Sequence, residues 1–250
     1  MATKKKVTKK KTTAVAKRAT TDVATIQQQL QDEAAGIQGQ IGAPSTKAIR
    51  LTDKVFTMPD GTVIQDELEV VIVDFISQNK LYEGKYDPKN PEPPVCYAIG
   101  KVVNSMVPSP NSQDMQVSKG ESCAECPMNQ WGSDGDGKAC KNTRVLAVVL
   151  PDAEETEVYT ISVPPTGIKG FDGYVGSIAK LYNLPPIGVK TTISFHPEKT
   201  YPLPLFGNPV PNEQLQEHFA FRAEAETLLT VEPEYGVVVE KPARRTKKRA

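Results

Sequence analysis

The pattern of apolar and polar residues predicts three kinds of segment along the chain. Between residues 20 and 38, apolar side chains recur at intervals of three and four, which predicts an amphipathic helix capped by Thr21 or Asp22. Its apolar stripe is thin, so we expect this helix to dock on the body of the protein or on another copy. Glycine, alanine and proline within residues 39–44 then predict a linker.

From about residue 49 the pattern changes to one that is typical of strands. Residues 55–58 and 62–64 flank an Asp-Gly pair, which predicts a β-hairpin. Residues 68–76 are β-branched and almost continuously apolar, which suits a central strand. Further strands are predicted at residues 95–103, 144–150, 157–163, 189–196 and 201–206, the last of them a proline-bearing edge strand.

Two further helices are predicted, at residues 171–184 and 211–229, from apolar side chains that recur on one face. The order is therefore strands, one helix and two more strands, which is typical of a small Greek-key barrel of the oligonucleotide-binding (OB) type. We expect a mainly β (α+β) fold: an OB-like barrel at residues 49–210 and a C-terminal helix at residues 211–230. Other α+β sheets also fit this order.

The net charge of zero hides three differently charged segments. Residues 1–22 hold eight Lys and Arg and one acidic residue, residues 241–250 hold six and none, and the rest has a net charge of −13. We expect basic tails at residues 1–22 and 231–250, joined to the body by the helix and linker of residues 23–48. Such tails are typically disordered and bind polyanions by releasing counterions. Alternatively, they keep the protein soluble or fold back onto its acidic body.

All four cysteines lie between residues 96 and 140, which makes this segment the strongest candidate for chemistry. Cys123 and Cys126 have the two-residue spacing at which a tight turn directs both sulfurs toward one ion, and Cys96 and Cys140 complete a tetrahedral set. The loop before Cys140 is rich in Gly, Asp and Ser, so a metal would supply order that apolar packing does not. The pattern favours a closed structural zinc site without catalytic function.

Three other interpretations of the cysteines stay open: an iron–sulfur cluster, two disulfides, or four buried thiols. Disulfides are disfavoured because no secretory signal begins the chain. No apolar run approaches the ~18 residues that a membrane-spanning helix needs. We therefore expect a soluble protein of the cell interior that makes no membrane contact.

Binding of single-stranded nucleic acid requires cations along the backbone and exposed aromatic rings for base stacking. Trp131 is the strongest candidate, because it lies in a polar loop with no evident core to bury it; the alternative is packing over the cysteines. The acidic body opposes such binding unless its acids lie on another face. The full candidate set is Tyr82, Lys85, Tyr86, Tyr97, Lys101, Trp131, Lys138, Lys141 and Arg144.

An enzymatic function is not indicated. The carboxylates are scattered rather than clustered for a divalent metal, and His196 and His218 are isolated and far from the cysteines. The chain has neither a phosphate-binding glycine loop nor a nucleophile motif. We expect a non-enzymatic protein.

Several motifs resemble those of a group of tailed-phage replication-region proteins that are described as single-stranded-DNA-binding. The resemblance covers roughly residues 50–207. The motifs are Tyr82-Glu-Gly-Lys-Tyr86-Asp-Pro, Pro-Pro-Val-Cys96-Tyr-Ala, Cys123-x2-Cys126-Pro-x-Asn129-x-Trp131-Gly-Ser133 and Gly137-Lys-Ala-Cys140-Lys-Asn.

This resemblance implies a zinc-bearing OB-type fold that coats single-stranded DNA in phage replication or recombination, in the host cytoplasm, with phage replication proteins as partners. One feature departs from it. Many single-strand-binding proteins end in an acidic tail that recruits partners, whereas this chain ends in Arg and Lys. The alternative function is a zinc-stabilised structural or protein-interaction protein, associated with transcription or the virion, whose basic tails contact DNA non-specifically.

Overall fold

The structure is a computed structural model, and it describes residues 47–84, 92–117, 120–151, 153 and 156–233. Several sequence predictions lie outside these residues: the basic tail of residues 1–22, the helix of residues 20–38, and the end of the chain from residue 234. The candidates Lys85 and Tyr86 also lie outside them.

Nine strands, four short 3-10 helices and three α-helices make up the described body, which is mainly β. The strands are β1 (Ala48–Thr52), β2 (Val55–Thr57), β3 (Val63–Gln65), β4 (Glu67–Leu81), β5 (Cys96–Gly100), β6 (Lys141–Val149), β7 (Val158–Val163), β8 (Val189–Phe195) and β9 (Pro204–Pro211). The helices are η1 (Val103–Ser105), η2 (Pro127–Asn129), η3 (Pro165–Gly167), α2 (Ile168–Tyr182), η4 (Pro186–Gly188), α3 (Leu215–Ala220) and α4 (Arg222–Leu229).

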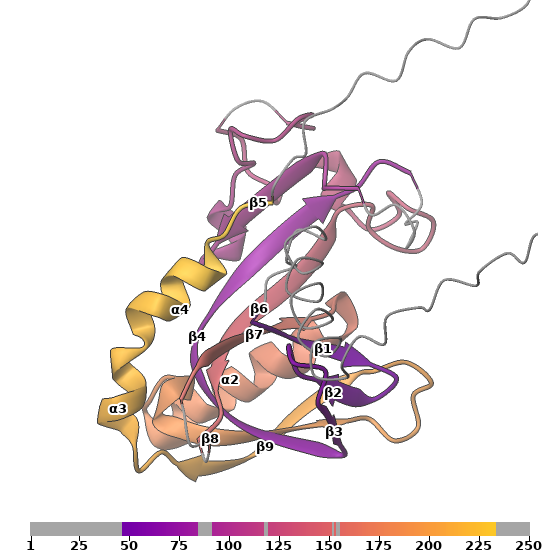
Figure 1. Cartoon of the computed structure of the whole chain (residues 1–250). Coiled ribbons are helices and arrows are strands. Elements are labelled where there is room, and N and C mark those ends of the chain that lie inside the picture. Colours follow the sequence, from indigo (N-terminus) through magenta and orange to yellow (C-terminus); the bar gives the residue numbers. More distant parts are fainter. Residues whose placement is uncertain (1–46, 85–91, 118–119, 152, 154–155, 234–250) are drawn as a thin grey trace, which may run out of the picture. The chain divides into compact units, whose positions relative to one another are not determined.

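Strand β4 is the centre of the sheet. Its 15 residues pair with β6 along one edge, while the other edge pairs with β8 near the start of β4 and with β5 near its end. The strand order is β3-β2-β1-β7-β6-β4-β8-β9, and the sheet curls into an open half-barrel (Figure 1). The predicted central strand is therefore confirmed, although it is longer than residues 68–76.

The predicted hairpin is confirmed as β2 and β3. Gly61 adopts a φ of 89°, a left-handed conformation that favours glycine, and the backbone N–H of Thr62 donates to Asp60 Oδ1 over 2.8 Å. Strand β1 pairs antiparallel with β2 and parallel with β7, so it attaches this hairpin to the main sheet.

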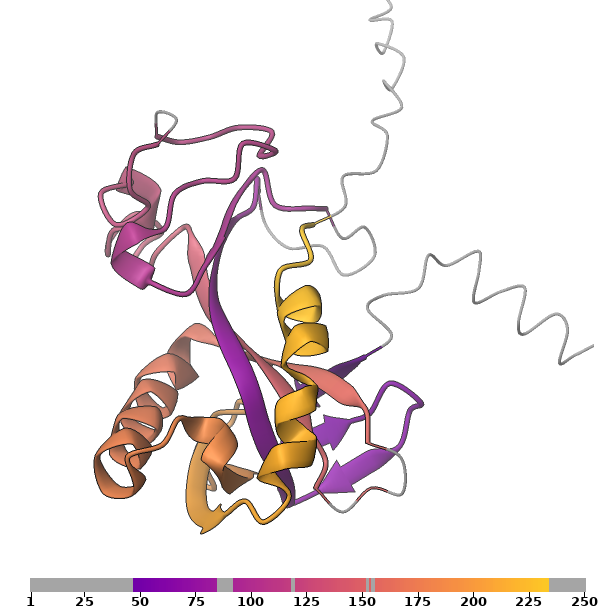
Figure 2. The same ribbon diagram turned by 90° about the vertical axis from the view of Figure 1, so that its left-hand side faces the viewer.

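Both faces of the sheet are buried, because α2 covers one and α4 the other (Figure 2). Side chains alternate between faces along a strand, so a strand covered on both sides is apolar at successive positions. This explains the continuous apolar run in β4, where Ile72 belongs to the core under α2, and Val71 and Val73 to the core under α4. Phe171 of α2 is fully buried against the first of these cores, and Ala225 and Leu229 of α4 against the second.

A segment at residues 101–140, which we call the cysteine lobe, lies between β5 and β6. Among its described residues, one buried apolar cluster is found, which consists of Met106 and Cys123 with Ala98 of β5. The lobe thus extends from the end of the sheet where β4, β5 and β6 pair, away from the main apolar cores.

Other element boundaries differ from the predictions. The C-terminal helix divides into α3 and α4 at Phe221, and the last strand is β9 rather than residues 201–206. The end of β4 is polar, yet Ser77, Gln78 and Asn79 are buried, because their backbone pairs with β5 on one side and β6 on the other. Pairing on both edges satisfies their backbone groups and keeps the strand extended.

Candidate metal centre and nucleic-acid interface

The structure brings all four cysteines to one small cavity. Cys96 begins β5, Cys123 and Cys126 lie in the turn before η2, and Cys140 directly precedes β6. Asn79 and Leu81 of β4 line the same cavity, so the end of the central strand forms one of its walls. All four cysteines are free thiols, and Cys123 and Cys126 are buried. Residues 44 positions apart in sequence thus share one site, as the zinc prediction requires.

The placement of the thiols is not that of a formed metal site. In the described residues, no group of three or more His, Cys, Asp and Glu side chains is arranged to hold a metal ion. Lining one cavity is a weaker condition, because ligands of one tetrahedral zinc, at Zn–S distances of about 2.3 Å, must have sulfurs about 3.8 Å apart. The shared cavity shows that the four thiols lie near one another.

The electrostatics of the cavity disfavour four thiolates without a cation. Burial, together with the smaller effect of the other three cysteines, raises the pKa of Cys140 to about 12, and Lys138 opposes the shift. Burial also raises the pKa of Cys123, and a hydrogen bond with Asn79 partly offsets this rise. A cation that stabilises thiolates would reverse these shifts, so the donor set suits a thiophilic metal such as zinc or iron.

A chain of asparagine side chains joins the lobe to the sheet. Asn129 Nδ2 donates to the carbonyl of Cys123 over 2.8 Å, and Asn142 Nδ2 on β6 donates to Asn129 Oδ1 over 3.0 Å. Asn142 Nδ2 also donates to Asn79 Oδ1 on β4 over 2.6 Å. This chain of contacts was not evident from the sequence, since the asparagines are distant in sequence and each alone is typical of a turn.

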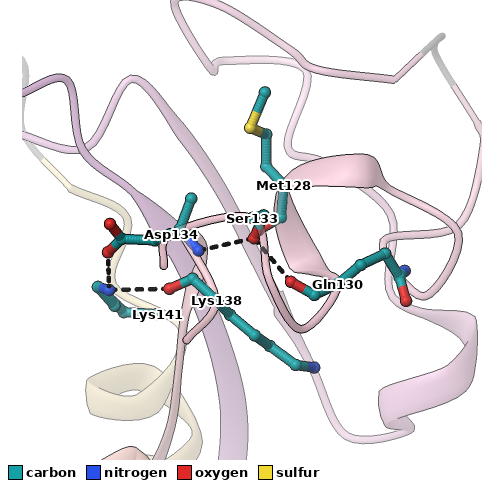
Figure 3. Close-up of polar contacts among 7 residues, drawn as sticks. Met128, Gln130, Ser133, Asp134, Lys138 and Lys141 are labelled. Atoms are coloured by element: carbon teal, nitrogen blue, oxygen red, sulfur yellow. Dashed lines mark hydrogen bonds and ion pairs between the residues drawn. The ribbon is translucent and has the colours of Figure 1, made fainter. Parts of the chain in front are cut away.

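Polar contacts also hold the loop between Cys126 and Cys140, as Figure 3 shows. Ser133 Oγ lies 2.9 Å from the carbonyl oxygen of Met128 and 2.7 Å from that of Gln130, and it accepts a hydrogen bond from the Ala139 N–H over 2.9 Å. Lys141 Nζ contacts Asp134 Oδ2 at 3.0 Å and the carbonyl of Lys138 at 2.8 Å. Hydrogen bonds rather than apolar packing therefore define this loop.

Trp131 projects from the same loop with 78% of its surface exposed. Lys138 Nζ lies 5.8 Å from the centroid of its ring, within the range of a cation–π contact. Most of the ring therefore faces solvent instead of packing over the cysteines. An exposed ring beside a cation has the chemistry needed to stack a base and attract a phosphate.

The remaining predicted nucleic-acid residues are placed less favourably. Tyr97 is only 2% exposed, and its hydroxyl lies 3.1 Å from Ser109 Oγ, so its ring is not open to a base. Arg144 is buried and donates to both carboxylate oxygens of Asp172, over 3.1 and 2.9 Å. Burial and this bidentate pair make Arg144 a structural cation.

Besides Trp131 and Lys138, three nucleic-acid candidates keep exposed surface. Lys101 pairs with Asp74 at 2.8 Å, and Lys141 pairs with Asp134 at 3.0 Å, and both lysines remain about half exposed. Tyr82, just beyond β4, is 42% exposed. Trp131 and Lys138 therefore share one loop of the cysteine lobe, and Lys141 begins β6 directly after that loop. Lys101 is the first residue of the lobe, and Tyr82 directly follows β4.

Neither histidine lines the cysteine cavity. His218 is buried on α3, and its Nδ1 lies 3.1 Å from Asn212 Oδ1. The Asn212 amide group donates to the carbonyl of Ile187 over 2.9 Å, which identifies Oδ1 as an acceptor and His218 Nδ1 as the donor. His218 thus helps to fasten α3 to η4.

Comparison with protein family models, with curated proteins and with solved structures finds no match for this chain. Within the part of the chain that the structure describes, no helix combines the length and the apolar character needed to cross a membrane. Function must therefore be inferred from the chemistry of the cysteine lobe and of the surface beside it.

Proposed function

We propose that the chain is a non-enzymatic single-stranded-DNA-binding protein of a bacteriophage, which coats single strands during DNA replication or recombination in the host cytoplasm. The observation that supports this best is the exposed ring of Trp131 beside the ammonium group of Lys138. Stacking accepts any base, because each has a π face, and the cation attracts the adjacent phosphate. Phage replication proteins are the partners that we propose.

The order of elements supports an OB-type fold for this role. Strands β4, β6 and β7 are followed by α2 and then by β8 and β9, which is the predicted series of strands, helix and two strands. In OB folds the loop between the first two strands contacts nucleic acid. If β4 and β6 are those strands, β5 and the cysteine lobe occupy that loop, and Trp131 lies where contact is expected.

A structural zinc ion held by Cys96, Cys123, Cys126 and Cys140 is part of the proposal. The lobe has few buried apolar residues, and its four thiols line one cavity. Zinc would draw the sulfurs together and neutralise thiolates that burial disfavours, and its binding energy would order the loop that presents Trp131. The ion has no direct role in DNA binding.

The experiment uses the fact that Trp131 is the only tryptophan of the chain. We expect unlabelled (dT)20 to quench its fluorescence on stacking, and a 20-base-pair duplex to leave it nearly unchanged. Trp131→Ala should weaken binding of fluorescein-labelled (dT)20 by about 5- to 150-fold, since one stacked base contributes about 1–3 kcal/mol.

Phe219→Ala is the matched control, because Phe219 is also an exposed aromatic residue but lies on α3, at the other end of α4 from the lobe (Figure 1). It should leave the affinity unchanged. Equal affinity for (dT)20 and duplex, without quenching and without an effect of Trp131→Ala, would show that the basic tails alone hold DNA. The structural or protein-interaction function would then be the better account.

A further inference from the structure

The face of the sheet that α4 covers continues beyond the end of that helix. Side chains alternate along β4, so Gln78, Lys80 and Tyr82 project from this face, while Asn79 and Leu81 project into the cysteine cavity behind it. Gln78 Nε2 lies 3.5 Å from the carbonyl of Leu229, the last residue of α4. Lys80 and Tyr82 therefore lie past the helix, where they line one groove with Val231, Glu232 and Pro233.

An open groove lies at this place, and we call it the Lys80 groove. One side is the end of β4, and the other is the chain that follows α4. The residues that line it are Lys80, Tyr82, Glu92, Pro93, Pro94, Val231, Glu232 and Pro233. The cysteine cavity lies on the other face of β4 at this place, because Asn79 and Leu81 line it.

Lys80 forms no ion pair with any residue that the structure describes. Among the same residues, no hydrogen bond of its ammonium group is found. Its burial lowers the pKa of the ammonium group, which means that the folded protein disfavours this charge. The residue directly opposite on β6 is Lys141, and like charges at such positions are destabilising. A bound anion would stabilise the buried ammonium group of Lys80 and screen it from Lys141.

The other charges of the groove restrict which anion fits. Glu232 accepts hydrogen bonds from Asn111 over 2.7 Å and from Ser109 over 3.1 Å. Hydrogen bonds with Asn111, Tyr97 and Ser109 lower its pKa, which favours the charged form. Glu92 also lines the groove. The two carboxylates repel a dianion such as a terminal phosphate more strongly than a ligand with a single negative charge, which Lys80 can pair with. A phosphodiester carries a single negative charge, and Tyr82 with the prolines offers apolar surface to a base or sugar.

We propose that the Lys80 groove binds one internal phosphodiester unit of a single-stranded nucleic acid, with Lys80 contacting the phosphate and Tyr82 the base. This inference rests on the proposed function, and it extends the binding surface from the cysteine lobe to the opposite face of β4.

The probe is the dinucleotide thymidylyl-thymidine (TpT), which has one internal phosphodiester and no terminal phosphate. In amide NMR spectra of the full chain, TpT should shift the signals of Tyr82, Val231 and Glu232. Lys80→Met keeps most of the apolar stem without the charge, and it should remove these shifts. Thymidine monophosphate, which is largely a dianion at neutral pH, should shift them less at equal concentration.

A second readout separates a ligand-binding lysine from a structural one. Because Lys80→Met removes a disfavoured charge, it should raise the thermal midpoint of unfolding while weakening the binding of labelled (dT)20. The slope of log affinity against log salt should fall by about 1. Lys54→Met is the matched control, since Lys54 Nζ already donates to the carbonyl of Pro197 over 2.8 Å. It should leave the TpT shifts unchanged.

The outcomes distinguish this inference from the proposed function. If TpT leaves the groove signals in place, or shifts them equally in Lys80→Met, the groove is not the site, even if quenching of Trp131 upholds single-strand binding. A lower midpoint for Lys80→Met would overturn the premise of an uncompensated cation. Shifts in the groove without quenching of Trp131 would support the groove and reject the lobe as the stacking surface.

Discussion

The sheet and the cysteine lobe are held together in different ways. The sheet has an apolar core on each face, and fully buried side chains such as Phe171 and Leu146 come from segments far apart in the chain. The lobe has one small cluster, around Met106 and Cys123, and otherwise depends on hydrogen bonds of Asn129 and Ser133. Because water competes for hydrogen bonds, each contributes only about 0.5–1.5 kcal/mol. We therefore expect the proposed zinc ion to matter for the order of the lobe and not for that of the sheet.

The largest expected effect is on the stability of the sheet. Phe171 is fully buried, with ring centroids 5.0 Å from Phe75 and 5.1 Å from Phe206. Phe171→Ala should lower the free energy of unfolding by about 3–5 kcal/mol, as measured by urea denaturation. Leu181→Ala on the same helix is the control, because Leu181 is exposed and should change stability by about 0.5 kcal/mol or less. Similar losses in both variants would contradict burial at Phe171 as the cause.

Removal of the proposed zinc ion should speed hydrogen exchange in the lobe and leave exchange in the sheet unchanged. Elemental analysis of the purified chain should find one zinc, and a chelator should then speed hydrogen exchange of amides in residues 120–140. Amides of β4 and β8 should keep their protection, because their cores contain no ligand. Cys126→Ser should reproduce the effect of the chelator.

Glu125→Gln, next to Cys126, is the control and should retain zinc. Iron in place of zinc would identify a cluster instead. A chain without any metal, or exchange that the chelator leaves unchanged, would show that polar contacts alone order the lobe and would remove the contrast between the two regions.

A smaller effect is expected from pH at the end of the sheet near α3. Burial lowers the pKa of His218 below its ordinary value of about 6.5. The folded state therefore favours the neutral ring, and the stability that this contributes is fully present above pH 6.5 and declines as the pH falls below it. Urea denaturation between pH 7 and pH 5 should show a smaller decline for His218→Gln than for the unmodified chain. His196→Gln should retain the full decline, and equal declines in all three proteins would contradict this role of His218.

Much of the fold follows from local sequence patterns. Alternation and β-branched residues predicted β6, β7 and β8, the Asp-Gly pair predicted the hairpin of β2 and β3, and apolar spacing predicted α2. The polar end of β4, at Ser77–Asn79, was missed, because its burial comes from pairing with β5 and β6. The break between α3 and α4 was missed as well, since the apolar spacing continues across it.

The candidate metal centre and nucleic-acid surface, like the fold, were predictable in part. The spacing of Cys123 and Cys126 and the polarity of their loop pointed to one cluster of thiols and to an exposed Trp131. The burial of Tyr97 and Arg144 was not evident, because their partners Ser109 and Asp172 are 12 and 28 residues away. Lys80 was overlooked, although alternation from Ile76 along β4 would have placed it on the face that α4 covers.

The sequence alone therefore determined the strands, the clustering of cysteines and the segregation of charge, since these depend on periodicity, spacing and composition within short segments. The tertiary structure alone decided which charges are compensated. Arg144 pairs with Asp172 and Lys141 with Asp134, while Lys80 forms no ion pair among the described residues. The physical reason is that the free energy of a charge depends on its solvation and on its neighbours, which the packing of distant segments sets.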